Sequence, residues 1–189
     1  MLLTNITFGQ TYSEQNKKCS EILKDVPIGD SIFWEKLELR NKCLLGLKAP
    51  NFSVKTLDKE LIDIDSLKGK VLFLNFWFTK CTPCIKEMPL LNKLKTSFKD
   101  KDILFLSFAN EDSTKISEFL KKTRFNFKHI PHGGTILIET FKLFSIWPTT
   151  IIIDKEGIIR FIKVGELNDK IDFHKKLITN LLRKKLLPT

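Results

Sequence analysis

The pattern of apolar and polar positions predicts strands and helices that follow one another along most of the chain. Residues 71–78 form a run that is apolar except for Asn75 and rich in aromatic side chains, which is typical of a strand covered on both faces. The residues after this run recur at the three- and four-residue spacing of one helical face: Ile85, Met88, Leu91, Leu94 and Phe98. A buried strand followed by an amphipathic helix is therefore the centre of the predicted fold.

Similar patterns on both sides extend this prediction. Strands are predicted at 52–54, 61–64, 102–108, 125–130, 151–153 and 158–164. Helices are predicted over about 30–42, 112–122 and 136–144, and a last helix is capped by Asn168 or Asp169. Strands alternating with helices, closed by a hairpin and a final helix, indicate an α/β fold with a mixed central sheet.

Length and pattern divide the chain into three parts. We expect residues 46–189 to form one domain and residues 11–45 to form a partly helical N-terminal extension. Residues 1–10 lack a basic region and have a short apolar stretch, so they are either the remnant of an export signal or an ordinary chain terminus.

The net charge of the chain bears on which partners it could bind. The net charge is +10, carried mostly by scattered lysines. A nucleic-acid binder would show a basic stripe with a recognisable motif, and none is found, so we expect a solvated basic surface and no nucleic-acid partner. The same charge favours proximity to an anionic membrane surface. No apolar stretch is long enough to cross a membrane.

The chemistry is expected at Cys81 and Cys84, a CxxC pair where the central strand meets the helix. There the helix dipole and the neighbouring Lys80 would stabilise a thiolate on Cys81, and Cys84 lies one turn further on. A structural zinc site usually needs two such pairs, whereas the remaining cysteines, Cys19 and Cys43, are far apart. The spacing favours a redox-active dithiol without metal or cofactor.

At this point the chain resembles the TlpA/ResA group of thiol-disulfide oxidoreductases, members of the redoxin superfamily with a thioredoxin-like fold. The resemblance covers residues 46–189. Its motifs are Gly46–Phe52 (GLKAPNF), Asn75–Trp77 (NFW), Cys81–Cys84 (CTPC), Glu87–Pro89 (EMP) and Trp147–Thr150 (WPTT). It implies exchange of the cysteine pair with protein cysteines, and an inserted strand and helix around residues 125–145.

The resemblance also implies roles for single residues. Pro148 would be a cis-proline that faces the dithiol, where Trp147 offers its backbone to an extended substrate. Glu87 would manage protons, because Asn75 stands where ordinary thioredoxins have an aspartate. The alternative for Glu87 is an exposed helical glutamate paired with a lysine.

Substrate contacts are expected from the residues around the cysteines and the proline: Lys80, Thr82, Pro83, Trp147 and Pro148. Two of them depart from the family pattern, since Lys80 stands where a tryptophan is usual and Trp147 where smaller residues are common. The expected partners are proteins with cysteine pairs and an upstream thiol-disulfide electron donor. Whether the substrate is an apocytochrome in cytochrome c maturation, an assembly factor or another exported protein stays open.

Two other functions are alternatives for a chain of this pattern. A peroxiredoxin-like peroxidase needs a threonine three residues before its cysteine, but position 78 is Phe, and neither Arg124 nor Arg160 has a matching motif. A copper-binding chaperone of the same fold spaces its cysteines by three residues rather than two, and the histidines, at 129, 132 and 174, suit structural or solvated positions.

The remaining cysteines bear on location. In a cytosolic protein Cys19 and Cys43 would be free thiols, whereas in an exported protein they would pair as a structural disulfide. We expect export, which places the protein in the periplasm or at the outer face of the bacterial cytoplasmic membrane, as a monomer. The direction of electron flow cannot be read from the sequence.

Overall fold

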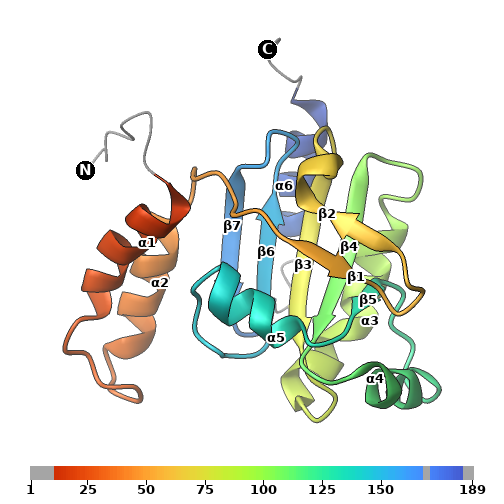
Figure 1. Ribbon diagram of the computed structural model, residues 1–189, viewed down its shortest axis with the longest axis horizontal. Coiled ribbons are helices and arrows are strands. Elements are labelled where there is room, and N and C mark those ends of the chain that lie inside the picture. Colours follow the sequence, from red (N-terminus) through yellow and green to blue (C-terminus); the bar gives the residue numbers. More distant parts are fainter. Residues whose placement is uncertain (1–10, 168–170, 185–189) are drawn as a thin grey trace.

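The computed structural model of the chain describes residues 11–167 and 171–184 (Figure 1). Residues 1–10, either an export-signal remnant or an ordinary terminus, and the helix cap expected at Asn168 or Asp169 lie outside the described residues. Over the described part of the chain, no helix is both long and apolar enough to cross a bilayer.

A five-stranded mixed sheet forms the middle layer, with the strand order β5-β4-β3-β6-β7. Its strands are β3 (Val71–Trp77), β4 (Ile103–Ala109), β5 (Lys128–Ile130), β6 (Thr149–Ile153) and β7 (Ile159–Val164). β3, β4 and β5 are parallel, and β6 runs antiparallel to both β3 and β7. The central strand is the buried apolar run, since all seven of its residues are buried. The mixed sheet flanked by helices confirms the predicted fold class.

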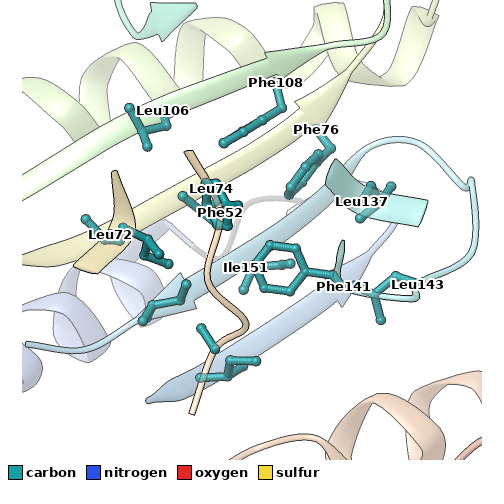
Figure 2. Packing of buried hydrophobic residues seen from close by; sticks show 14 of the residues in the cluster. Phe52, Leu72, Leu74, Phe76, Leu106, Phe108, Leu137, Phe141, Leu143 and Ile151 are labelled. Carbon is teal, nitrogen blue, oxygen red and sulfur yellow. The ribbon is translucent and has the colours of Figure 1, made fainter. Parts of the chain in front are cut away.

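Successive residues of β3 point to opposite faces of the sheet, so this strand supplies two separate cores. Leu72, Leu74 and Phe76 face the hairpin of β1 (Ser53–Lys55) and β2 (Leu61–Asp63). The segment after β5 covers the same face with α5 (Gly133–Thr135) and the π-helical η3 (Ile136–Thr140), through Leu137 and Phe141 (Figure 2). The short 3-10 turn η2 (Ile64–Leu67) leads from this hairpin towards β3.

The opposite face of the sheet carries three longer helices. They are α3 (Thr82–Thr96), α4 (Ser113–Leu120) and α6 (Ile171–Arg183). Phe73 and Trp77 of β3 belong to this second core, together with Met88 and Leu91 of α3. Asp112 caps α4, since its side chain accepts a hydrogen bond from the Lys115 amide.

The N-terminal extension is a pair of helices beside β7, the edge strand of the sheet (Figure 1). α1 (Tyr12–Ser20) and α2 (Phe33–Cys43) are separated by the 3-10 turn η1 (Glu21–Leu23), and a disulfide joins Cys19 to Cys43. Helix α2 was predicted, but α1 was not, because its sequence is polar. Its start is fixed locally instead, by a capping box between Thr11 and Glu14.

Among the predicted elements whose bounds differ in the structure, two show a clear physical reason. The strand predicted at 125–130 begins only at Lys128, because the Asn126 amide donates to the Asn92 side chain instead of joining the sheet. The helix predicted at 136–144 occupies 133–140, where Gly133 lies so close to Phe108 that an added Cβ would be 2.5 Å from that residue's Cβ.

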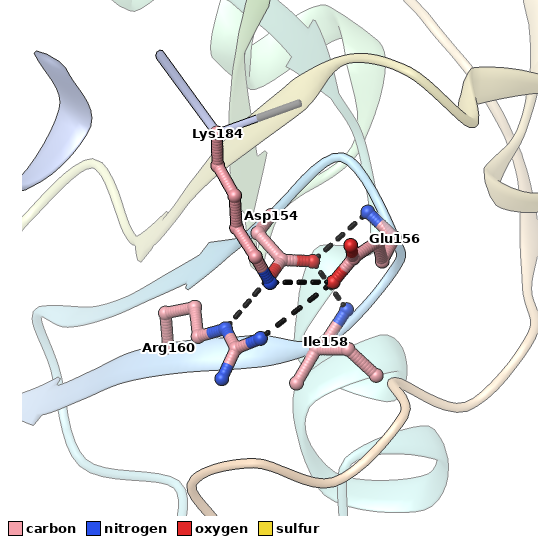
Figure 3. Close-up of polar contacts among 5 residues, drawn as sticks. All are labelled: Asp154, Glu156, Ile158, Arg160 and Lys184. Atoms are coloured by element: carbon pink, nitrogen blue, oxygen red, sulfur yellow. Dashed lines mark hydrogen bonds and ion pairs between the residues drawn. The ribbon is translucent and has the colours of Figure 1, made fainter. Parts of the chain in front are cut away.

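The turn between β6 and β7 is fixed by a buried carboxylate (Figure 3). Asp154 accepts hydrogen bonds from the Glu156 and Ile158 amides and from Arg160 Nε, the last at 2.6 Å. Lys184, just past α6, bonds to Glu156 at 2.7 Å. This cluster ties the C-terminal helix to the end of the sheet away from the cysteine pair.

Candidate active site

Cys81 and Cys84 lie where β3 gives way to α3, and they form a disulfide with a Cα–Cα distance of 5.2 Å. Cys81 is the N-cap residue of α3, and its Sγ accepts a hydrogen bond from the Cys84 amide at 3.2 Å. A sulfur at this place receives both an unpaired amide and the positive end of the helix dipole, which favours the thiolate form.

The turn before Cys81 is held by hydrogen bonds on both sides. The Cys81 amide donates to the Phe78 carbonyl at 3.1 Å. Thr79 donates twice to Glu111 Oε1, from its amide at 2.8 Å and from its hydroxyl at 2.7 Å. Glu111 follows β4 and was not recognised from the sequence, because nothing in its neighbourhood marks a contact with the loop after the adjacent strand.

Glu87 lies one helical turn after Cys84 and is buried, with 5% of its surface exposed. Its carboxylate accepts hydrogen bonds from Asn75 Nδ2 at 2.9 Å and from the Leu167 amide at 3.1 Å. Burial raises its pKa to about 7, although the bonds from Leu167 and Asn75 act in the opposite direction and the charge of Glu166 adds slightly to the increase. The alternative of an exposed helical glutamate is therefore wrong.

A row of polar residues crosses the sheet beneath α3. Register places Asn75 of β3 beside Thr150 of β6 and Ser107 of β4, and Ser107 beside His129 of β5. Asn75 Nδ2 also bonds to Thr150 Oγ1 at 3.2 Å, while the Ser107 hydroxyl is shared by Trp77 Nε1 and His129 Nδ1. Four hydrogen-bonding side chains thus lie at one level of an otherwise apolar face.

Trp147 and Pro148 stand at the start of β6, beside the end of β3. The peptide bond between them is cis. Trp147 is half-buried, and its ring packs edge-on against Phe78 with a centroid distance of 6.2 Å. The Phe78 carbonyl accepts the hydrogen bond from the Cys81 amide. Trp147 is therefore linked to the cysteine loop through a single residue, Phe78.

The other expected contact residues surround the same point. Lys80 and Thr82 are exposed on the two sides of Cys81, and Pro83 is half-buried in the first turn of α3. The structure thus brings together all of the residues predicted for the site, whereas Cys19 and Cys43 lie apart from it in the extension.

The arginines and histidines considered for a peroxidase or a copper chaperone do not contact the cysteine pair in any interaction of the described residues. Arg160 is bound to Asp154 at the far end of the sheet, and Arg124 is exposed. His129 is buried and bonds to Ser107 and to the Phe125 carbonyl, and His174 is buried on α6. In the described residues, no cluster of three or more histidine, cysteine, aspartate or glutamate side chains is arranged to hold a metal ion.

Sequence reasoning missed two groups that hold Glu87 in place, the Leu167 amide directly and Thr150 through Asn75, and it also missed Ser107 on the neighbouring strand β4. One signal was present, since Ser107 is the single polar residue of the strand ILFLSFA. That Ser107 would lie beside Asn75 could not be predicted, because the register between two strands cannot be derived from the sequence of either strand alone.

Comparison with known proteins agrees with this geometry. The model of the AhpC/TSA family matches residues 45–162. Thiol-disulfide oxidoreductase ResA of Bacillus cereus is 32% identical over 154 residues, which cover 80% of this chain and 88% of that protein. Thioredoxin-like protein YneN of Bacillus subtilis is 34% identical over 128 residues, 66% of this chain and 74% of its own.

Solved structures show the same fold. A putative protein disulfide isomerase from Bacteroides thetaiotaomicron is 25% identical with a TM-score of 0.66, covering 74% of this chain and 91% of its own. A putative thiol:disulfide interchange protein DsbE from Chlorobium tepidum superposes with a TM-score of 0.65 over 73% of this chain and 97% of its own, at 21% identity. Neither the peroxidase nor the copper chaperone is favoured by these relatives. The chain belongs to the AhpC/TSA family, as a TlpA/ResA-like redoxin and thiol-disulfide oxidoreductase.

Proposed function

We propose that this oxidoreductase reduces protein disulfides outside the cytoplasm, with Cys81 as the nucleophile and Cys84 as the resolving thiol. The observation that carries the assignment is the position of Cys81 Sγ, which caps α3 and accepts the Cys84 amide. Of the two sulfurs, the one at the helix terminus gains more from carrying a negative charge.

The reaction proceeds in two exchanges. In the reduced enzyme, the Cys81 thiolate attacks one sulfur of the substrate disulfide, and the other substrate sulfur leaves as a thiolate that takes up a proton. Cys84 then loses its proton and attacks Cys81 Sγ, which releases the second substrate thiol. The product is the Cys81–Cys84 disulfide described above, and an upstream dithiol donor returns it to the reduced form.

Glu87 is the proposed proton acceptor for Cys84. The two side chains lie one turn apart on the buried side of α3. A carboxylate whose pKa is about 7 takes up and releases a proton near neutral pH, which suits a general base. Asn75 and the Leu167 amide hold the carboxylate in place by their hydrogen bonds.

The same carboxylate favours a reducing role. When Glu87 is ionised, its charge opposes a thiolate on the neighbouring cysteine. A less stable thiolate form makes the dithiol a stronger reductant, since stabilised thiolates characterise oxidising members of such enzymes. We therefore propose that electrons flow from the dithiol to the substrate.

A location outside the cytoplasm is supported by the second disulfide. All four cysteines of the chain are paired, and Cys19–Cys43 lies in the extension, away from the exchange site. Disulfides without a catalytic role persist mainly in oxidising compartments. The periplasm, or the outer face of the bacterial cytoplasmic membrane to which the positive net charge would be attracted, is the proposed compartment.

Substrate recognition is proposed for the surface around Cys81, made by Lys80, Thr82, Pro83, Trp147 and Pro148. Two features support it: Trp147 offers a half-buried aromatic face beside the cysteine loop, and Lys80 adds an exposed cation. Aromatic residues of this kind contribute a large share of binding energy at protein interfaces.

A trapping experiment tests the assignment of the two cysteines. Cys84→Ser should accumulate a mixed disulfide between Cys81 and a protein substrate, visible by non-reducing electrophoresis and mass spectrometry. Cys81→Ser, the matched control, should trap nothing. Equal trapping by both variants would overturn the assignment.

A further inference from the structure

We infer that the N-terminal helical pair positions the loop of residues 141–148 for docking of a protein substrate, with Arg40 as the positioning residue. This loop links η3 to β6 and ends in Trp147 and Pro148. The inference rests on the proposed protein substrate, but it assigns a role to an extension that takes no part in the exchange chemistry.

Arg40 makes the first connection. It lies in α2 with 1% of its surface exposed, and its Nη2 donates to the Lys142 carbonyl at 2.6 Å. The same nitrogen donates to Asn16 Oδ1 of α1 at 3.0 Å, and Nη1 donates to Asn41. A buried guanidinium without its acceptors is costly in free energy. The bond from Arg40 therefore holds the Lys142 carbonyl in place.

Tyr12 and Asn16 of α1 hold the preceding carbonyl. The Tyr12 hydroxyl donates to Phe141 O at 2.6 Å, and Asn16 Nδ2 donates to the same oxygen at 3.2 Å. The Tyr12 ring also packs edge-on against the Phe141 ring, with centroids 6.2 Å apart. Helix α1 therefore binds the Phe141 carbonyl and helix α2 binds the Lys142 carbonyl, directly where η3 ends.

The backbone at this point needs such support. Lys142 has φ of 50°, in the left-handed region that residues other than glycine seldom occupy. Its carbonyl is the one that Arg40 holds. Since the chain changes direction here, the orientation of Lys142 determines the path of the residues that follow.

The contacts continue to the cysteine pair. Phe33 of α2, 1% exposed, packs against Phe144 of the loop with centroids 5.8 Å apart. Three residues later Trp147 contacts Phe78, whose carbonyl accepts the Cys81 amide. Two packing contacts, at Phe144 and at Trp147, are thus joined by the two residues of chain between them and link the extension to the proposed docking surface.

Two assays separate positioning from stability. Arg40→Met should raise KM for a protein disulfide, with insulin as the probe, by about tenfold, the loss expected when one charge-assisted hydrogen bond is removed. Tyr12→Phe, which removes only a hydroxyl and keeps the fold, should raise KM in the same direction by a smaller factor. Reaction with the small disulfide 5,5′-dithiobis(2-nitrobenzoate) should be unchanged in both variants.

Leu37→Ala is the matched control. Leu37 is buried in α2, with 2% of its surface exposed, but it lines a cavity beside β7 instead of the loop. It should lower the melting temperature while leaving KM for insulin unchanged. The inference is overturned when Arg40→Met and Tyr12→Phe match this control in KM, or when the small-disulfide rate falls in parallel.

Tryptophan fluorescence gives a readout that does not need a protein substrate. In a Trp34→Phe background the remaining indoles are Trp77, which is fully buried, and Trp147. Arg40→Met should increase quenching by acrylamide, because Trp147 becomes more accessible, whereas Leu37→Ala should not. Unchanged quenching overturns the positioning role. If wild-type protein fails to reduce insulin, the proposed function is wrong, and quenching alone then decides the inference.

Discussion

Single residues decide how the cysteine pair handles charge. Cys81 receives stabilisation from a helix terminus, while Glu87 is a buried acid on the same helix. The two influences oppose each other, because the first favours a thiolate and the second disfavours it once Glu87 is ionised. The balance between them therefore varies with pH around the pKa of Glu87, which is about 7.

Replacing the acid should shift that balance. Glu87→Gln removes a negative charge close to the dithiol, so the apparent pKa of the reduced cysteines should fall and the pH dependence of exchange should flatten. Alkylation of the reduced protein by iodoacetamide at a series of pH values measures both. A Cys titration that matches that of the wild type would show that Glu87 does not interact with the thiols.

The stability of the fold should also respond to Glu87. Its pKa is raised from 4.5 to about 7, so the folded state holds the proton more tightly than the unfolded state and stability falls as pH rises across this interval. The upper limit of this loss is about 3 kcal/mol. Urea unfolding of the oxidised protein at pH 5 and pH 8 should show a smaller difference for Glu87→Gln than for the wild type. Equal differences in the two proteins would contradict the raised pKa.

The ring beside the cysteine loop should matter for large substrates. Trp147→Ala should impair exchange with folded proteins more than with a small disulfide reagent, since only the former need the surface around Trp147. Trp34→Ala removes an exposed tryptophan on α2 and serves as the control. Equal losses with both kinds of substrate would leave Trp147 as a packing residue only.

At the scale of elements, the sequence predicted those helices and strands whose buried face shows as a regular apolar pattern. The run at 71–78 and the helical stripe that follows it became β3 and α3, because an apolar pattern with a clear period states which face is buried. Helix α1 was not predicted because its sequence is polar and part of its tertiary contact consists of hydrogen bonds from Tyr12 and Asn16 to a distant carbonyl. At the site, the cysteines and Glu87 were predictable from motifs, whereas Glu111 depends on loop contacts that no pattern reveals.

The polarity of helices should separate the two disulfides in reactivity. Cys81 lies at the N-terminus of its helix, whereas Cys19 and Cys43 lie in the last turns of α1 and α2. The negative end of a helix dipole disfavours a thiolate, so these two sulfurs leave poorly in exchange. After mild reduction opens Cys81–Cys84, peptide mapping should still find the Cys19–Cys43 link. Alkylatable thiols at both positions would contradict this and weaken the case for export.

Across the whole molecule, the residues of the cysteine site and the buried ion-pair cluster around Asp154 lie at opposite ends of the sheet. The cysteine pair follows the last residue of β3, whereas Asp154 follows Ile153 of β6, which pairs with Leu72 at the other end of β3. Figure 3 shows the Asp154 cluster. Asp154→Ala should lower the free energy of unfolding by about 2–4 kcal/mol, because loss of the buried carboxylate leaves two amides and the Arg160 side chain without this acceptor. Urea unfolding measures the cost, and the exchange rate per folded molecule should stay unchanged. A parallel loss of exchange would show that the two ends are coupled.

The row formed by Thr150, Asn75, Ser107 and His129 has a consequence for how the sheet assembles. These side chains meet only when four strands are aligned as they are here. A slip of one residue would turn Asn75 into the apolar layer around Phe76, where its amide would lack a partner at a cost of several kcal/mol. Asn75, which bonds to Glu87, and Thr150, which bonds to Asn75, thereby favour the correct strand alignment as well as the position of the acid.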